Sequence, residues 1–367
     1  MKMKENTKKS QMTDLRTKEH FEAYPQLQAE DIFKYLFQSA FGCEHLVSSQ
    51  EAAVAYIERE YETVSKKEAP LIEPLDGAYS RVHLSCLNDG LTPKTLARLF
   101  CLSAKKEEDG KRALEEKLEA TKALVKSGAL PLDANVFEEK LATWRALDFP
   151  AIHHSEDFRK AYKPAYRVIA NRYVDFLPLF TQIDKRLAKG AVIVAIEGGS
   201  AGGKSTLADI LQEVYACNVI HMDDFFLRPE QRTKERFLEV GGNIDYERFA
   251  LEVISPLAKN AAVSYRPFNC ATQSLGEPVT LAPTPLTVVE GVYSMHPSFG
   301  KYYDLSIYLN IDPAYQRERI LARNSPAFAK RFFEEWIPLE DLYFSKTNIK
   351  ERTDTVLPIP PNQRGAQ

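Results

Sequence analysis

Residues 198–205 match the spacing G-x-x-x-x-G-K-[ST], in which glycines, a lysine and a hydroxyl residue stand at fixed positions. Small residues let consecutive backbone N–H groups turn inward and hold phosphate oxygens. Lys204 would then reach the β- and γ-phosphates of ATP, and the Ser205 hydroxyl would bind Mg²⁺. The alternative is a glycine-rich turn without function. The predicted nucleotide-binding residues are Gly198, Gly199, Ser200, Ala201, Gly202, Gly203, Lys204, Ser205 and Thr206.

Carboxylates follow two later apolar runs. Asp223 comes directly after residues 218–222, and Glu290 follows residues 286–289. Near a triphosphate, Asp223 can accept the proton of an attacking hydroxyl or help to hold the metal. Glu290 fits the second acid of such a site, which orders Mg²⁺ together with Ser205. The alternatives are a helix cap for Asp223 and a solvated acid at a strand end for Glu290.

Basic and aromatic side chains elsewhere suggest the rest of a site. Arg266 and Phe268 follow a third apolar run at 261–265 and are candidates for a substrate wall, although aromatic residues there also suit plain core packing. Arg319 and Arg323 are spaced to share a helical face. A mobile basic segment can bring cations to a transferred phosphoryl group, so Arg323 is a candidate catalytic residue and Arg319 a nucleotide contact. The alternative for both arginines is a solvated charged face.

The elements that must position these residues are short strands alternating with helices. The predicted strands are 191–197, 218–222, 261–265, 286–289, 304–310 and 353–357, and the helices lie near 204–215, 245–258, 313–323 and 326–336. This alternation is typical of a parallel α/β sheet with helices on both faces. Such sheets bind ligands at the carboxyl ends of their strands, which is where the loop and both acids stand.

The preceding part of the chain has a different texture. Apolar residues recur at helical spacing in several segments, including 165–177 and a further stretch to 187. The predicted organisation is a disordered tail over 1–20, a mostly helical domain of unknown function over 21–187, a P-loop kinase domain over 188–357 and a flexible tail over 358–367. Cys43, His45, His83 and Cys86 offer metal-ligand side chains, but their spacing is not that of common zinc fingers. The adjacent residues His153 and His154 are more typical of a loop or a core than of metal ligands.

Composition limits the function classes. The chain of 367 residues is 44% hydrophobic and 27% charged, which is typical of a globular protein. A formal net charge of −3 predicts no general attraction to nucleic acid, and the absence of a long apolar run predicts no membrane span. Five scattered cysteines and a polar, Lys-rich start without a signal-peptide core favour a cytoplasmic protein without a disulfide framework. Whether the chain forms a homo-oligomer stays open.

These motifs together resemble the uridine kinase and phosphoribulokinase family of P-loop kinases, over residues 190–357. The resemblance is carried by the glycine-rich loop, by His-Met-Asp-Asp-Phe-Phe at 221–226, by Val-Val-Glu-Gly-Val-Tyr at 288–293, and by the segments 316–324 and 336–340. It implies a nucleoside-kinase-like core and ATP-dependent phosphorylation of a hydroxyl on a small molecule. It also implies that Asp223 is the general base and that Arg319 and Arg323 are lid arginines.

The acceptor differs between members of this group. Uridine kinases carry a Tyr-Asp segment where this chain has Phe268 and Asn269, and the form Asp-Asp-Phe-Phe is similar to nicotinamide riboside kinases and glycerate-type kinases. The acceptor side would then include Asp224, Phe226 and Arg232. The sequence therefore predicts an ATP- and Mg²⁺-dependent kinase of the uridine kinase type. The alternatives are a nicotinamide riboside- or glycerate-type kinase and an ATP-binding switch whose helical domain binds a partner protein.

Overall fold

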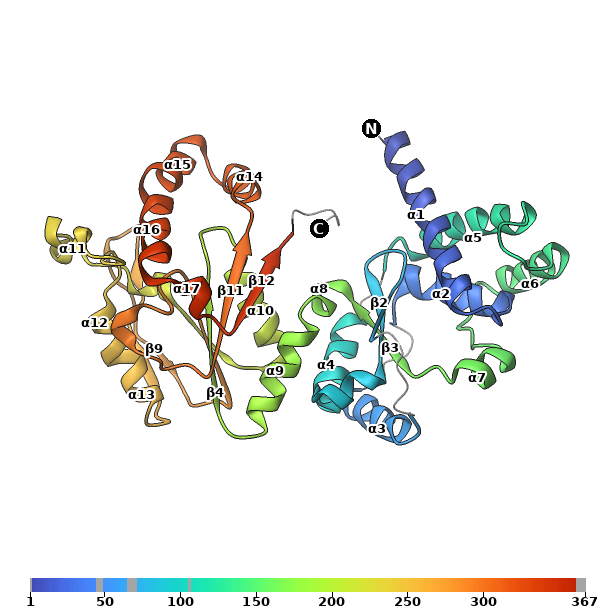
Figure 1. Cartoon of the computed structure of the whole chain (residues 1–367), viewed down its shortest axis with the longest axis horizontal. Coiled ribbons are helices and arrows are strands. Elements are labelled where there is room, and N and C mark those ends of the chain that lie inside the picture. Colours follow the sequence, from blue (N-terminus) through green and yellow to red (C-terminus); the bar gives the residue numbers. More distant parts are fainter. Residues whose placement is uncertain (1, 44–48, 65–70, 105–106, 361–367) are drawn as a thin grey trace. The chain divides into compact units, whose positions relative to one another are not determined.

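The computed structural model describes residues 2–43, 49–64, 71–104 and 107–360, with side chains from residue 13 onward. The chain divides into two compact units, Met1–Asp184 and Lys185–Gln367, and each is described by itself. The predicted fold class is confirmed, because a parallel sheet flanked by helices follows a mostly helical region (Figure 1). In the described part of the chain, no helix combines the length and apolar character needed to cross a bilayer.

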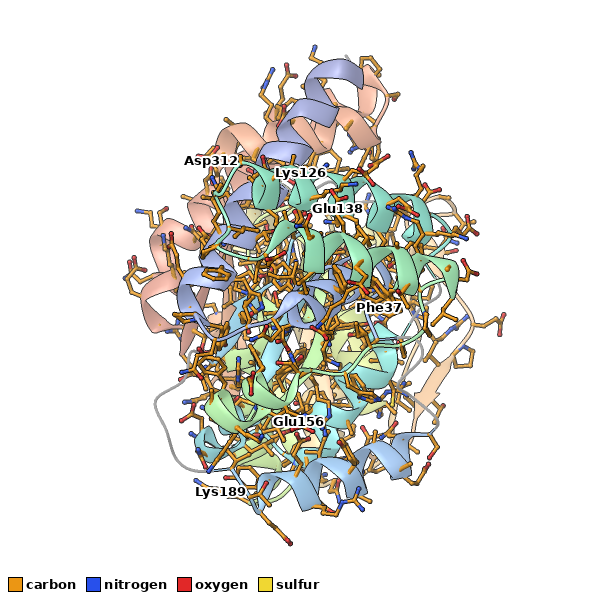
Figure 2. The ribbon with its side chains drawn as sticks, turned by 90° about the vertical axis from the view of Figure 1, so that its right-hand side faces the viewer. Phe37, Lys126, Glu138, Glu156, Lys189 and Asp312 are labelled. Atoms are coloured by element: carbon orange, nitrogen blue, oxygen red, sulfur yellow. The ribbon has the colours of Figure 1, made fainter. Side chains whose placement is uncertain are left out.

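Helices make up most of the first unit. Apolar faces of the amphipathic helices α2 and α5 pack together, and ion pairs join neighbouring helices at the surface. One such pair links Lys126 at the end of α5 to Glu138 on α6 at 2.8 Å (Figure 2). The helices are α1 Lys2–Ala23, α2 Ala29–Phe41, α3 Gln50–Tyr61, α4 Pro93–Ser103, α5 Gly110–Lys126, α6 Ala134–Ala146, α7 Glu156–Tyr162, α8 Asn171–Val174 and α9 Leu177–Leu187, which extends past the unit boundary, with a 3₁₀ turn at Leu84–Asp89.

The first unit also contains a three-stranded antiparallel sheet that the sequence analysis missed. Its order is β1 Ile72–Pro74, β2 Tyr79–His83 and β3 Tyr166–Ala170. The prediction of a helix over 165–177 is therefore wrong, since the strand β3 and the short helix α8 occupy most of that segment. The strand begins with a tyrosine and contains two β-branched residues, a composition that suits a sheet.

The expectation of a disordered tail over residues 1–20 is also wrong for the described residues. Residues 2–23 form helix α1, and its side chains at Thr17 and His20 are buried. At the other end, β12 extends to Ile359, so the first residues assigned to the flexible tail belong to a strand. Residues 361–367 of that predicted tail lie outside the described residues.

The second unit is built on a five-stranded parallel sheet with the order β12-β11-β4-β10-β5. Its strands are β4 Val192–Glu197, β5 Asn218–His221, β10 Leu286–Glu290, β11 Leu305–Ile311 and β12 Thr355–Ile359. In Figure 1 the labelled strands β4, β11 and β12 run side by side. Every residue of β10 is buried, as its continuous apolar run predicts for an inner strand.

One predicted strand does not join this sheet. Residues 263–265 form β6, which pairs antiparallel with β9 Val279–Leu281 in a separate two-stranded sheet. A second hairpin pairs β7 Phe268–Asn269 with β8 Ser274–Leu275. The helical elements of this unit are α10 Lys204–Tyr215, α11 Lys234–Leu238, α12 Tyr246–Phe249, α13 Ser255–Leu257, α14 Pro313–Arg323, α15 Pro326–Arg331, α16 Ile337–Thr347 and α17 Ile349–Arg352, with π-helical turns at Ala250–Ile254 and Phe332–Trp336.

Candidate active site

The glycine-rich loop connects the central strand β4 to helix α10, which is the context that the motif requires. Gly198 has a φ of 139°, and a Cβ there would stand 2.7 Å from the backbone oxygen of Leu309. A Cβ at Gly202 would stand 2.8 Å from the oxygen of Gly199. The loop can therefore close tightly only with glycine at these positions, and its N–H groups lead into the positive end of α10.

Lys204 begins α10 and is 9% exposed. Its Nζ donates a hydrogen bond to the backbone oxygen of Gly199 at 3.0 Å, so the ammonium group folds over the loop. Within the described ranges this carbonyl is the hydrogen-bond partner of Lys204, so the ammonium group retains donors for an anion. This position suits the contact with phosphate oxygens that the sequence predicts.

Glu290, Ser205 and His221 meet at the edge of the sheet next to the loop. The Ser205 hydroxyl donates to Oε1 of Glu290 at 3.1 Å, and Nδ1 of His221 lies 2.6 Å from the same oxygen. Glu290 is 5% exposed, which excludes the alternative of a solvated acid at a strand end. The hydrogen bond with Glu290 raises the pKa of His221, because it stabilises the imidazolium. The contact of His221 with Glu290 is not among the features predicted from the sequence.

These oxygen ligands fit Mg²⁺ better than a tightly bound transition metal. Among the described residues, no group of three or more His, Cys, Asp and Glu side chains could hold a metal by itself. Mg²⁺ bound to a nucleotide takes one or two protein ligands and completes its shell with phosphate oxygens and water. A serine hydroxyl beside a buried carboxylate is such a pair.

Asp223 lies in the 3₁₀ turn Met222–Phe225 that follows β5. Its carboxylate is exposed to a cavity and makes no hydrogen bond with the described residues, so the alternative of a helix cap does not apply. Withdrawal from bulk water raises the pKa of Asp223, and the nearby charge of Lys204 opposes the shift. A free carboxylate with a raised pKa is suited to accepting a proton.

The segment that carries the predicted lid arginines contacts the loop. Nε2 of Gln316 on α14 donates to the backbone oxygen of Ser200 at 2.7 Å. Glu340 on α16 accepts hydrogen bonds from the Ser200 N–H at 2.8 Å and from the Ser200 hydroxyl at 2.5 Å. Neither side chain is a predicted site residue. Glu340 is 5% exposed, and burial raises its pKa.

The two predicted lid arginines are placed differently. Nη1 of Arg319 lies 3.7 Å from where a Cβ on Gly203 would stand, so its guanidinium lies beside the loop. Partial burial, and then the charge of Arg323, lowers the pKa of Arg319. Arg323 is exposed at the end of α14. The two guanidinium groups repel each other, and an anion bound at Arg319 would reduce that repulsion.

A cavity of about 570 Å³ opens beside the loop. Ser200, Asp223 and Glu340 lie on its wall, which also contains the amide side chains of Asn243 and Gln273. Six aromatic residues from three separate segments also line it: Phe226, Phe237, Tyr293, Phe328, Phe332 and Trp336. The cavity has the size and the mixture of apolar wall and few polar groups that small-molecule sites have.

The predicted acceptor residues divide into two groups. Phe226 and Arg232 line the cavity, and Arg232 is held by two hydrogen bonds from its guanidinium to the backbone oxygen of Leu227. The other three, Asp224, Arg266 and Phe268, do not line it. Asp224 accepts a hydrogen bond from Tyr265, Arg266 donates to the oxygen of Gly276, and Phe268 is a buried residue that packs beneath the Arg232 guanidinium. Their contacts stabilise the surrounding loops, and their assignment to the acceptor stays a prediction.

The candidate zinc ligands of the first unit are not assembled in the described residues. Cys86 is buried, and Nε2 of His83 lies 3.7 Å from Glu73. His45 lies outside the described residues, while Cys43 is a buried thiol that donates to the oxygen of Phe100. As the sequence suggests, His153 and His154 precede α7 without sharing a helical face.

Comparison with known proteins adds little to this geometry. No family model matches the chain, and a search of curated proteins gives no significant match. A solved structure described as a possible uridine kinase from Bacillus stearothermophilus is 21% identical, with a TM-score of 0.37, over 49% of this chain and 99% of that chain. A shikimate kinase from Bacteroides thetaiotaomicron is 14% identical, with a TM-score of 0.26, over 45% of this chain and 85% of that chain. Such values do not identify an activity, so the function has to be argued from the site itself.

Proposed function

We propose that the second unit is an ATP-dependent kinase that phosphorylates a hydroxyl group of a small molecule. One observation carries this proposal: the carboxylate of Asp223, which makes no hydrogen bond with the described residues, and the loop residue Ser200 line the same cavity. A group that can take a hydroxyl proton and the phosphate-binding loop therefore share one cavity. A site built only for nucleotide binding would not need a second compartment lined by six aromatic side chains.

The residues of the chain divide the work. The loop N–H groups, Lys204 and Arg319 would bind the triphosphate, and Ser205 with Glu290 would hold Mg²⁺. Bound ATP with Mg²⁺ would supply the γ-phosphoryl group. Asp223 would accept the proton of the acceptor hydroxyl as the hydroxyl oxygen bonds to the γ-phosphorus. The bond from the γ-phosphorus to the β,γ-bridging oxygen would break at the same time, ADP would leave with that oxygen, and the exposed Arg323 would move in to neutralise the transferred charge.

The lining of the cavity favours an acceptor with a ring. Six aromatic side chains offer flat surfaces for stacking, and the amides of Asn243 and Gln273 offer both donors and acceptors. Arg232 on the wall has its guanidinium bound to Leu227. These features suit a nucleoside-like molecule better than a small aliphatic hydroxy acid, so we place a uridine- or nicotinamide riboside-type acceptor ahead of a glycerate-type one.

A screen for ADP release tests the proposal. The full chain is incubated with Mg²⁺ and ATP and with nucleosides, ring-containing sugars and hydroxy acids in turn, and Lys204→Ala serves as the control for contaminating kinases. We expect a ring-containing acceptor to raise ADP release in the natural chain and not in the variant. ATP consumption that no hydroxyl compound changes would contradict the proposal and favour a nucleotide-dependent switch.

A further inference from the structure

The first unit contains a cavity of its own, with a volume of about 610 Å³. Its wall is formed by α2, α3, α4, the residues before α7 and β3. This volume is within the range of small-molecule sites. The cavity takes no part in the proposed phosphoryl transfer, and the sequence analysis assigned no binding role to the residues around it.

The wall of this cavity is positively charged. Lys34, Arg59 and Arg167 contribute cations from α2, α3 and β3. Glu60 is the one carboxylate among the described lining residues, and Arg167 already holds it with a hydrogen bond of 2.8 Å. Lys34 donates only to the neutral backbone oxygen of Ile152, at 3.0 Å, among the contacts of the described chain. The buried carboxylate of Asp31 acts on Lys34 and balances part of its charge, whereas Arg59 makes no ion pair with the described residues. The wall therefore keeps positive charge that a ligand can balance.

Aromatic rings stand between these cations. The Tyr56 ring lies 5.3 Å from the guanidinium of Arg59 and 4.9 Å from that of Arg167, and Phe100 lies 5.9 Å from Arg167. A guanidinium held over a ring presents a flat, preorganised surface. The wall therefore combines fixed positive charge with surfaces on which a planar group can stack.

A buried polar array supports one side of the cavity. Asp31 is fully buried and binds Nδ1 of His154 at 2.8 Å, while Nε2 of the same ring lies 2.7 Å from the Tyr166 hydroxyl. Burial lowers the pKa of His154 to about 4, so the ring is neutral. With Nδ1–H bound to Asp31, Nε2 accepts a hydrogen bond from the Tyr166 hydroxyl. The Tyr166 oxygen also accepts a hydrogen bond from Nε2 of Gln38 at 3.4 Å, which leaves one lone pair for a donor on a ligand. Behind it, the fully buried Arg81 lies with its guanidinium carbon 4.6 Å from the centre of the Tyr166 ring.

We propose that this cavity binds a small organic anion, a phosphate or carboxylate group attached to a planar ring. The anionic group would be held by Lys34 and Arg59, the ring would stack on Tyr56, and a donor on the ring would bind Tyr166. Charge-assisted hydrogen bonds of this kind are about twice as strong as neutral ones, and arginine suits both phosphate and carboxylate. Such a site would give the first unit a ligand of its own.

Calorimetric titration of the full chain tests this site. Phenyl phosphate, benzoate and the uncharged benzyl alcohol are the probes, and the Lys204→Ala chain is used throughout so that the loop of the second unit contributes less. Lys34→Met and Arg59→Gln remove the cavity cations one at a time. Lys111→Met is the matched control, because Lys111 is an exposed lysine of the same unit that pairs with Asp148 and does not line the cavity.

We expect phenyl phosphate or benzoate to bind, with the tighter of the two identifying the anionic group, and benzyl alcohol not to bind. Lys34→Met should weaken binding by about tenfold or more, since a charge-assisted bond is lost. Arg59→Gln should also weaken it, and this exposed position does not threaten folding. Binding that is equal in both cavity variants and in Lys111→Met, or no binding of either anion, would overturn the proposal.

Discussion

Glu340 allows a quantitative test of phosphate binding by the loop, because its carboxylate is bound to hydrogen-bond donors of Ser200 that a phosphate would need. It accepts hydrogen bonds from the N–H and the hydroxyl of Ser200, inside the glycine-rich motif. The substitution Glu340→Gln removes the negative charge and keeps the size of the side chain. Both hydrogen bonds can persist, since the amide oxygen accepts the N–H and the amide nitrogen donates to the hydroxyl oxygen.

The size of the effect follows from these two bonds. A hydrogen bond to a charged group contributes about 1.5–3 kcal/mol and a neutral one about 0.5–1.5 kcal/mol, so each bond becomes weaker by about 1 kcal/mol. If ATP displaces both bonds, the variant should bind ATP more tightly by about 2 kcal/mol, which is about 30-fold in Kd. Burial raises the pKa of Glu340, so the difference should shrink as pH falls and the natural side chain becomes neutral.

The assay is equilibrium titration with a fluorescent ATP analogue and Mg²⁺ at two pH values. Glu334→Gln is the control, because Glu334 is an exposed acid of the neighbouring helical turn that pairs with Lys330 at 3.7 Å. We expect the control to bind as the natural chain does. Unchanged or weaker binding in Glu340→Gln would refute the reasoning that this carboxylate competes with phosphate.

Three further predictions concern the site, the loop and the first unit. Asp223→Asn should leave ATP binding in place and lower the rate of transfer to an identified acceptor by about 10²–10⁴-fold, measured as ADP release; full transfer would exclude Asp223 as the base. Gly198→Ala should destabilise the second unit by about 1–3 kcal/mol in guanidinium unfolding, because the new Cβ meets Leu309 at a φ of 139°. The pKa of His154 is lowered to about 4 in the folded chain. As pH falls, this histidine is therefore protonated in the unfolded chain at a higher pH than in the folded chain. The stability that this histidine contributes is present above its unfolded pKa of about 6.5 and should fall by about 3 kcal/mol as pH drops toward 4. Guanidinium midpoints of His154→Gln should change less over that range, and an equal change would contradict the assignment.

The sequence predicts those parts of the site whose residues are adjacent in the chain. A continuous apolar run, a glycine-rich loop and a helical repeat are adjacent in the chain, so β4, the loop and α10 are readable from their order. Asp223 and Glu290 are predictable for a related reason, since each directly follows a strand and parallel strands end at one edge of the sheet. These inferences need no knowledge of which distant segments pack together.

Contacts between distant segments are not readable in this way. Gln316 and Glu340 stand 116 and 140 residues from the Ser200 that they contact, and the sequence offers many other acids and amides on its helices. The same limit applies in the first unit. The strand β3 pairs with β2 more than eighty residues earlier. Its short run also fits a helical repeat, and local periodicity gives no sign of the partner strand.

Glu197 shows what a local pattern hides. It ends the apolar run of β4 as an acid and yet is fully buried. It accepts hydrogen bonds from the N–H groups of Gly198, Tyr293 and Met295 and from the Tyr343 hydroxyl, and burial raises its pKa to about 7. The one carboxyl group thus joins the start of the loop to the segment after β10 and to α16.

The helix that Glu197 anchors also carries the residue that covers the loop. Tyr343 and Glu340 stand one turn apart on α16, and they contact Glu197 and Ser200 respectively. A change in the position of that turn would therefore alter the Tyr343–Glu197 contact and the Glu340–Ser200 contact together. If phosphate is to take the Ser200 donors, either Glu340 swings away alone or the whole turn moves and strains the bond to Glu197. The first route needs only a side-chain rotation, whereas the second would make nucleotide affinity depend on the protonation of Glu197 near neutral pH.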